Sequence, residues 1–77
     1  MNKQPFYHCG HFTGKKLDIE KIVKSTQTVL KDTVEYYDNE LLFTATSNVS
    51  YIINKKLAKI GIIGDVEAEP GDPCDLM

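Results

Sequence analysis

The middle of the chain reads Val34-Glu35-Tyr36-Tyr37-Asp38-Asn39-Glu40-Leu41-Leu42-Phe43-Thr44-Ala45-Thr46, and residues 33–46 predict a β-hairpin. The pair Asp38-Asn39 tolerates the positive φ angles that a two-residue type I′ turn requires. This turn pairs Tyr36 with Leu41 and brings the apolar residues of both strands onto one face, as the period of two along a strand demands. The predicted buried face consists of Val34, Tyr36, Leu41, Phe43 and Ala45.

The segment before the hairpin predicts an amphipathic helix, because its apolar residues recur at the spacing of one helical face. Asp18 suits the N-cap, where a carboxylate accepts hydrogen bonds from free backbone N–H groups. Leu17 and Ile22 then occupy the two positions of a hydrophobic staple. The helix is expected to end near Lys31 or Asp32, and its apolar face is Ile19, Ile22, Val23, Thr26, Val29 and Leu30.

A second helix is predicted after the hairpin. Ser47 or Asn48 suits its N-cap, and Gly61 suits the C′ position, where a left-handed residue ends many helices. The predicted buried face of this helix is Val49, Ile52, Ile53, Leu57 and Ile60.

Strands are predicted at both ends of the domain, over residues 6–12 and 62–69, where Ile62, Gly64, Val66 and Ala68 alternate with outward residues. The order β-α-β-β-α-β predicts an α+β fold of ferredoxin-like type. Two helices pack on one face of its antiparallel sheet and leave the other face open. Residues 1–69 are expected to form a single domain, and residues 70–77 a flexible acidic tail.

A competing interpretation takes residues 40–62 as a helix-turn-helix that binds DNA through Lys55, Lys56 and Lys59. The alternation of apolar residues before Thr46 favours the hairpin instead. The net charge of −2 and the lack of arginine also argue against nucleic acid, since arginine is the preferred residue for phosphate and guanine contacts.

The composition is that of one small globular domain, with 77 residues of which 42% are hydrophobic and 26% charged. Its apolar stretches are too short to cross a bilayer, and no apolar segment of a secretory signal follows Met1. The expectation is therefore a cytoplasmic protein, or one whose signal has been cleaved off. Residues 65–77 hold five acids and no base.

The run His8-Cys9-Gly10-His11 combines imidazole and thiol groups, which suit zinc or copper. On a regular strand Cys9 and His11 share a face, whereas His8 points to the other face. A complete site would need His8 through a bulge at Gly10, Cys74, a carboxylate or a second molecule. The alternative is a half-buried strand in which these side chains fill space.

The layout resembles that of small heavy-metal-associated domains, through its element order and through the lysine-rich helix, glycine and strand over residues 53–67. The resemblance implies a metal site just after the first strand, with Cys9 near the first thiolate of the Cys-x-x-Cys loop of that family. The second thiolate position is occupied here by Phe12, so the motif of the family is incomplete.

No catalytic constellation of side chains is present in the sequence, so an enzyme is not expected. An open sheet face with apolar side chains favours a protein partner or self-association, and the alternative is that a loop or the tail covers it. The acidic C-terminal region is compatible with attraction to a basic partner, but a solvating tail explains it better. The leading hypothesis is thus a non-enzymatic protein-binding module, with metal binding as the first alternative and DNA binding as the second. The residues expected to contact a partner are Tyr7, Tyr37, Leu42, Thr44, Glu67 and Glu69.

Overall fold

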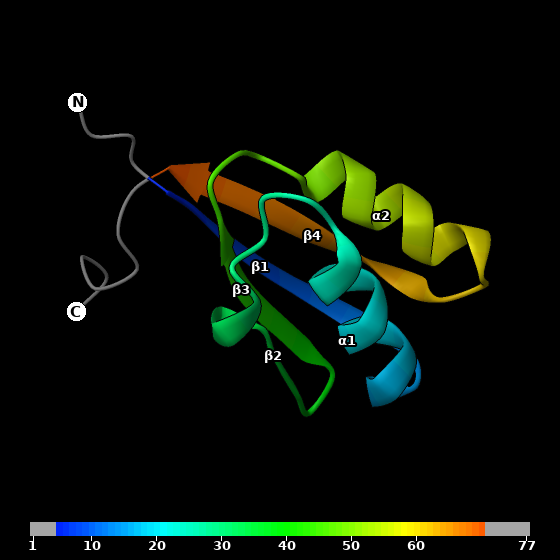
Figure 1. Cartoon of the computed structure of the whole chain (residues 1–77). Coiled ribbons are helices and arrows are strands. Elements are labelled where there is room, and N and C mark those ends of the chain that lie inside the picture. Colours follow the sequence, from blue (N-terminus) through cyan, green and yellow to red (C-terminus); the bar gives the residue numbers. More distant parts are fainter. Residues whose placement is uncertain (1–4, 71–77) are drawn as a thin grey trace.

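The computed structural model describes residues 5–70 and shows an α+β fold (Figure 1). Its elements are β1 (Phe6–Thr13), α1 (Lys16–Ser25), the 3-10 helix η1 (Lys31–Thr33), β2 (Glu35–Tyr37), β3 (Glu40–Ala45), α2 (Ser50–Lys59) and β4 (Ile63–Pro70). The four strands form one sheet in the order β2-β3-β1-β4, and every neighbouring pair is antiparallel. Two helices with an antiparallel sheet confirm the predicted α+β class.

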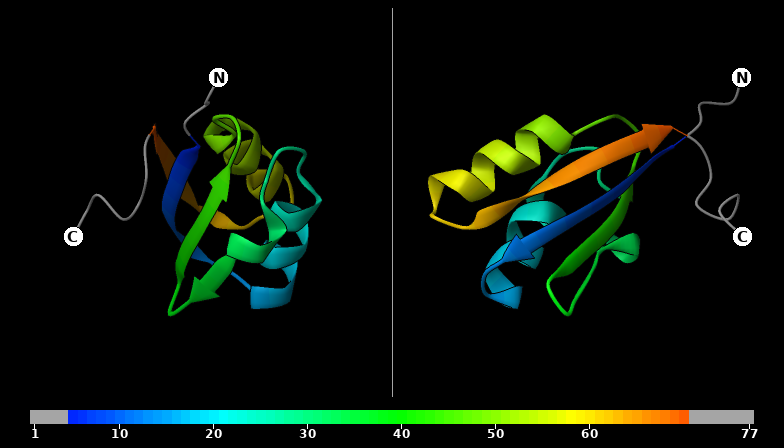
Figure 2. Two further views of the ribbon diagram at one scale, coloured as in Figure 1. Left: turned by 60° about the vertical axis from the view of Figure 1, so that its left-hand side comes forward. Right: turned by 180° about the vertical axis from the view of Figure 1, so that it is seen from behind.

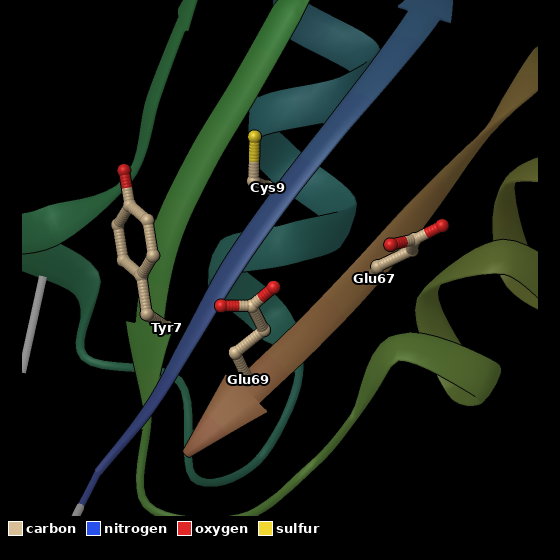
Figure 3. Close-up of a pocket in the computed structure, with 4 residues that line it drawn as sticks. All are labelled: Tyr7, Cys9, Glu67 and Glu69. Atoms are coloured by element: carbon tan, nitrogen blue, oxygen red, sulfur yellow. The ribbon is translucent and has the colours of Figure 1, made fainter. Parts of the chain in front are cut away.

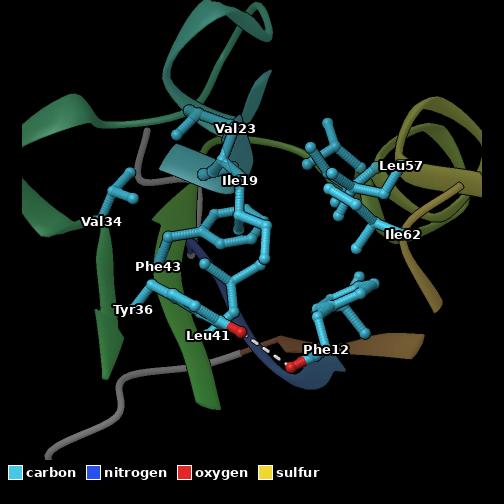
Figure 4. Close-up of a cluster of buried hydrophobic side chains, with 14 residues drawn as sticks. Phe12, Ile19, Val23, Val34, Tyr36, Leu41, Phe43, Leu57 and Ile62 are labelled. Carbon is cyan, nitrogen blue, oxygen red and sulfur yellow. Dashed lines mark hydrogen bonds between the residues drawn. The ribbon is translucent and has the colours of Figure 1, made fainter. Parts of the chain in front are cut away.

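Both helices cover the same face of the sheet and leave the other face open, as the side view in Figure 2 shows. The core between the two layers is built from side chains of every helix and strand named above except η1. It includes Phe12, Ile19, Leu41, Phe43, Ile53 and Leu57, each at most 1% exposed (Figure 4). The Tyr36 hydroxyl lies in this core and donates a hydrogen bond of 2.8 Å to the Phe12 carbonyl, which satisfies the one polar atom that this ring buries.

The hairpin has the predicted turn and register. Asp38 and Asn39 have φ angles of 54° and 69°, as a type I′ turn requires. Tyr36 pairs with Leu41, and the five predicted inward residues are all buried: Val34, Tyr36, Leu41, Phe43 and Ala45.

Helix α1 is shorter than predicted, because it ends at Ser25 instead of near Lys31. The side chains of Ser25 and Thr26 both donate hydrogen bonds of 2.9 Å to the Ile22 carbonyl, and such bonds compete with the helical backbone pattern. Thr28 then adopts a φ of 75°, which turns the chain away from the helix axis.

The two residues after this turn, Val29 and Leu30, lie beside strand β3 and not on a helix. Val29 forms an isolated bridge with Ala45, and the N–H of Leu30 donates to the Thr44 carbonyl at 2.9 Å. Val29 is therefore buried beside β3 and not on a helix, whereas Leu30 is 42% exposed. The helical spacing predicted the burial of Val29 correctly and its conformation wrongly.

The predicted start of α1 is also wrong. The helix begins at Lys16, with Lys15 at the N-cap and no side-chain cap, so Asp18 lies in the first turn. There its negative charge still interacts favourably with the positive end of the helix dipole. Leu17 is 79% exposed, so it forms no hydrophobic staple.

Helix α2 begins at Ser50, with Val49 at the N-cap instead of Ser47 or Asn48. The Asn48 side chain still contributes, since its Oδ1 accepts bonds from the backbone N–H and the hydroxyl of Ser50. Two predicted core residues, Ile52 and Ile60, are 44% and 53% exposed. They lie at the edges of the apolar stripe of α2.

The C-terminal end of α2 agrees with the prediction for Gly61, whose φ is +83°. The Gly61 N–H bonds to the Ala58 carbonyl and the Ile62 N–H to the Leu57 carbonyl, both at 3.0 Å. This pair of bonds defines a Schellman motif, which turns the chain directly into β4.

The helix-turn-helix interpretation is wrong, because residues 40–45 form the strand β3.

Strand β4 continues to Pro70, which is the first residue that the sequence assigned to the tail. The rest of that tail lies outside the described residues. Gly64 was predicted to face inward but is exposed. Its φ is +154°, and a Cβ there would collide with the His11 carbonyl oxygen of β1.

Neither α1 nor α2 has the length or the apolar character needed to cross a membrane.

Candidate functional site

The open sheet face, the side of the sheet that the helices leave uncovered, is organised around strand β1. Tyr7 and Cys9 point outward from β1, because they alternate with the buried residues His8 and Phe12. The register places Cys9 between Leu42 on β3 and Glu67 on β4.

One step along the sheet, the register places Tyr7 between Thr44 on β3 and Glu69 on β4. Five of the six residues predicted to contact a partner thus lie in two adjacent rows of this face: Tyr7, Leu42, Thr44, Glu67 and Glu69. The sixth, Tyr37, lies at the far end of β2 and is 81% exposed.

A pocket of about 300 Å³ opens on this face and is lined by Tyr7, Cys9, Glu67 and Glu69. Figure 3 shows the four side chains on the same side of β1 and β4. An aromatic ring, two carboxylates and a thiol therefore surround one cavity. An ammonium or guanidinium group matches such a lining, because it pairs with carboxylates and is attracted to the face of a tyrosine ring.

The charges of the molecule are divided between its two layers. The four strands carry five carboxylates and no lysine: Glu35, Glu40, Asp65, Glu67 and Glu69. Every lysine of residues 5–70 lies in α1, η1 or α2, or directly before α1. The Asp65 carboxylate accepts a bond from Asn54 on α2, and the other four make the open sheet face acidic. The helical layer also carries Asp18, Glu20 and Asp32, but its eight lysines leave it basic.

The same charges act on Tyr7. Burial raises the pKa of its hydroxyl above the ordinary value of 10.0, and negative charge at Cys9 and Glu35 raises it further. Tyr7 therefore stays neutral at physiological pH, and its hydroxyl remains available as a hydrogen-bond donor within the acidic face.

His8 lies on the opposite face of β1, inside the core. Its ring stacks on Phe43 with centroids 4.4 Å apart. Its Nδ1 is 3.0 Å from the Phe6 carbonyl, and its Nε2 accepts a bond of 3.0 Å from the Val49 N–H at the start of α2. Both ring nitrogens are thus occupied by backbone groups that lie far apart in the sequence.

Of the candidate metal ligands, the structure brings only Cys9 and His11 to the same face, where both are exposed. Within residues 5–70 no three histidine, cysteine or acidic side chains are grouped closely enough to hold a metal ion. Cys9 is a free thiol in this part of the chain. Cys74, the fourth predicted ligand, lies outside the described residues.

One polar contact that the sequence did not reveal covers the outer edge of β4. The Asn54 side chain, on α2, accepts a bond of 2.8 Å from the Val66 N–H and donates one of 3.2 Å to the Val66 carbonyl. It also donates to the Asp65 carboxylate at 2.9 Å. The amide of Asn54 thus replaces a neighbouring strand, which protects the edge from pairing with another chain.

Two members of the acidic face, Glu35 and Glu40, were not predicted from the sequence. The hairpin register contained this information, because it places Glu35 opposite the outward residue Leu42.

Comparisons of the chain with protein-family models, with curated proteins and with solved structures gave no match.

Proposed function

We propose that this chain is a non-enzymatic binding module of ferredoxin-like architecture that binds a basic segment of a partner protein on its open sheet face. The ferredoxin-like assignment is supported by the element order and by the position of β1 between β3 and β4. The observation that carries the functional proposal is the acidic face itself, with four outward strand carboxylates (Glu35, Glu40, Glu67 and Glu69), no strand lysine and a pocket next to Tyr7.

The pocket provides an anchor for one lysine or arginine side chain of the partner. Its cationic head would lie between Glu67 and Glu69, and its aliphatic stem against the ring of Tyr7. The remaining carboxylates steer the basic segment toward the sheet, and they contribute more to the association rate than to the final affinity. Edge pairing is a poorer explanation, because Asn54 occupies the middle of the β4 edge at Val66 and β2 has only three residues.

The test uses a peptide of alternating lysine and glycine, titrated into the isotopically labelled full chain at low salt. The NMR signals of Tyr7, Cys9, Glu67 and Glu69 are expected to shift, and the shifts should weaken as salt screens the charges. The variant Glu67→Gln/Glu69→Gln should lose most of the binding. Asp18→Asn/Glu20→Gln is the matched control, because it removes two carboxylates from α1 and leaves the pocket intact.

Two results would overturn the proposal. One is the lack of any shift at millimolar peptide, and the other is equal binding by both double variants. As a second readout, the peptide should slow the alkylation of Cys9 by iodoacetamide in a Cys74→Ser background, because Cys9 lines the pocket.

A second candidate function is the binding of zinc or copper through Cys9 and His11. It is supported by the exposure of both side chains on one face of β1. The set of ligands would be completed by Cys74 or by a second molecule, since His8 is held in the core. Addition of zinc or of Cu(I) should shift the His11 imidazole signals in the wild type and leave them unchanged in Cys9→Ser. Unchanged wild-type spectra would exclude this function.

A further inference from the structure

The outward surface of α2 combines cations with apolar side chains that the core does not use. Tyr51 is 73% exposed, Ile52 44% and Ile60 53%. Lys55 lies with its Nζ 5.7 Å from the centre of the Tyr51 ring, and Lys59 is exposed one turn further on. We call these five residues the α2 patch. A cluster of exposed apolar groups among cations marks an interaction surface.

We propose that the α2 patch of one copy of this chain docks on the open sheet face of a second copy. The inference rests on the proposed function, because it names a partner for the same acidic face. The α2 patch offers the cations that this face lacks, and its isoleucines match the outward Leu42. The two surfaces therefore complement each other in both charge and polarity.

The same charges disfavour the other ways in which two copies could pair. Two open sheet faces would bring Glu67 and Glu69 of one copy against the same carboxylates of the other. Two α2 patches would oppose Lys55 and Lys59 in the same way. Like charges across an interface weaken wrong pairings, so contact between unlike faces is favoured.

A contact between unlike faces leaves one free face at each end of the pair. Such a head-to-tail interface generates open assemblies unless the rotation between copies closes a ring. The assembly should grow with protein concentration and dissociate when salt is added, because its charged groups are exposed and are screened by ions.

The experiment is sedimentation velocity of the full chain over a range of protein concentrations, at about 0.01 M salt and at about 1 M salt. Between these two salt concentrations the Debye length falls from about 30 Å to about 3 Å. At low salt the average mass should rise above the 8.7 kDa of one chain, and at high salt it should return to that value. Lys55→Glu/Lys59→Glu should remain monomeric at low salt. Lys21→Glu/Lys24→Glu is the matched control, since it makes the same charge change on α1, and it should associate like the wild type.

Mixing two defective variants tests the orientation directly. Lys55→Glu/Lys59→Glu keeps a functional sheet face, and Glu67→Gln/Glu69→Gln keeps a functional α2 patch. Each variant alone should be monomeric, whereas their mixture should form a one-to-one dimer and grow no further. This result is specific to a head-to-tail contact.

The outcomes separate the two proposals. A wild-type chain that stays monomeric at low salt but binds the lysine peptide overturns self-association and leaves the proposed function intact. A chain that associates equally well with and without Glu67 and Glu69 overturns the use of the sheet face in self-association, and the peptide titration then decides the proposed function by itself. Binding of the α2 patch to an alternating glutamate-glycine peptide or to anionic vesicles, without self-association, overturns the second copy as its partner.

Discussion

Lowering the pH below 6.5 should destabilise the fold through His8. The ring of His8 is fully buried, and its Nε2 accepts the bond from the Val49 N–H. Because a backbone N–H only donates, Nε2 carries no proton and Nδ1–H donates to the Phe6 carbonyl. The folded chain therefore holds His8 as one neutral tautomer.

The direction of the effect follows from the pKa. Burial lowers the pKa of folded His8 below the ordinary value of 6.5, and the hydrogen bond to the Phe6 carbonyl opposes this only in part. As the pH falls through 6.5, the unfolded chain binds a proton that the folded chain does not. The free energy of unfolding should therefore fall by up to about 1.4 kcal/mol per pH unit between 6.5 and the folded pKa.

Below the folded pKa, protonated Nε2–H would face the Val49 N–H, so two donors would meet and the hydrogen bond would be lost. A positive charge would also lie at the positive end of the α2 dipole. We therefore expect the first turn of α2 to be the first part of the fold to loosen in acid.

The assay is urea unfolding followed by circular dichroism at a series of pH values, for the wild type and for His8→Phe. The phenyl ring keeps the stack on Phe43 but leaves the buried Val49 N–H without an acceptor, which costs about 1–3 kcal/mol. His8→Phe should thus be less stable at neutral pH, and the difference should shrink as the pH falls below 6.5. The control is His11→Gln, which changes an exposed histidine of the same strand.

The reasoning is refuted if the wild type and His8→Phe lose stability in parallel below pH 6.5. It is also refuted if the difference in free energy of unfolding between the wild type and His11→Gln changes with pH in the same way as the difference between the wild type and His8→Phe.

Three further predictions concern contacts that hold the elements together, and each is measured by urea unfolding. Gly10→Ala should lower the free energy of unfolding by about 1–3 kcal/mol, because the new Cβ would lie 2.6 Å from the Asp65 carbonyl oxygen; a neutral effect would contradict the close approach of β1 and β4. Gly61→Ala should lower the free energy of unfolding by only about 1 kcal/mol. The φ of +83° is strained for alanine, but no atom of the surrounding structure lies within 4 Å of the added Cβ. A loss as large as that of Gly10→Ala would contradict the view that Gly61→Ala adds backbone strain without a collision. Asn54→Ala should cost about 1–3 kcal/mol because it removes both partners of the Val66 backbone. A neutral effect of Asn54→Ala would argue against these two bonds.

The features that local sequence determined are those whose cause lies within a few residues. The Asp38-Asn39 turn and the alternation around it were sufficient to place Tyr36 opposite Leu41, because turn type and strand period together allow one register. Gly61 likewise marks the end of α2 through its own backbone conformation. The sharing of one face by Cys9 and His11 followed from strand periodicity alone.

The features decided by tertiary structure depend on residues that are distant in the chain. The helical spacing of Val29 did not make it helical, because α1 ends at Ser25 and Val29 instead bridges to Ala45 on β3. Asn54 became an edge cover only because α2 lies against β4, and His8 acquired its second bond from Val49, 41 residues further on. The pocket on the open sheet face also joins both ends of the domain, since β1 contributes Tyr7 and β4 contributes Glu69. Local periodicity determines which side of an element is apolar, whereas the pairing of distant strands determines which side chains meet.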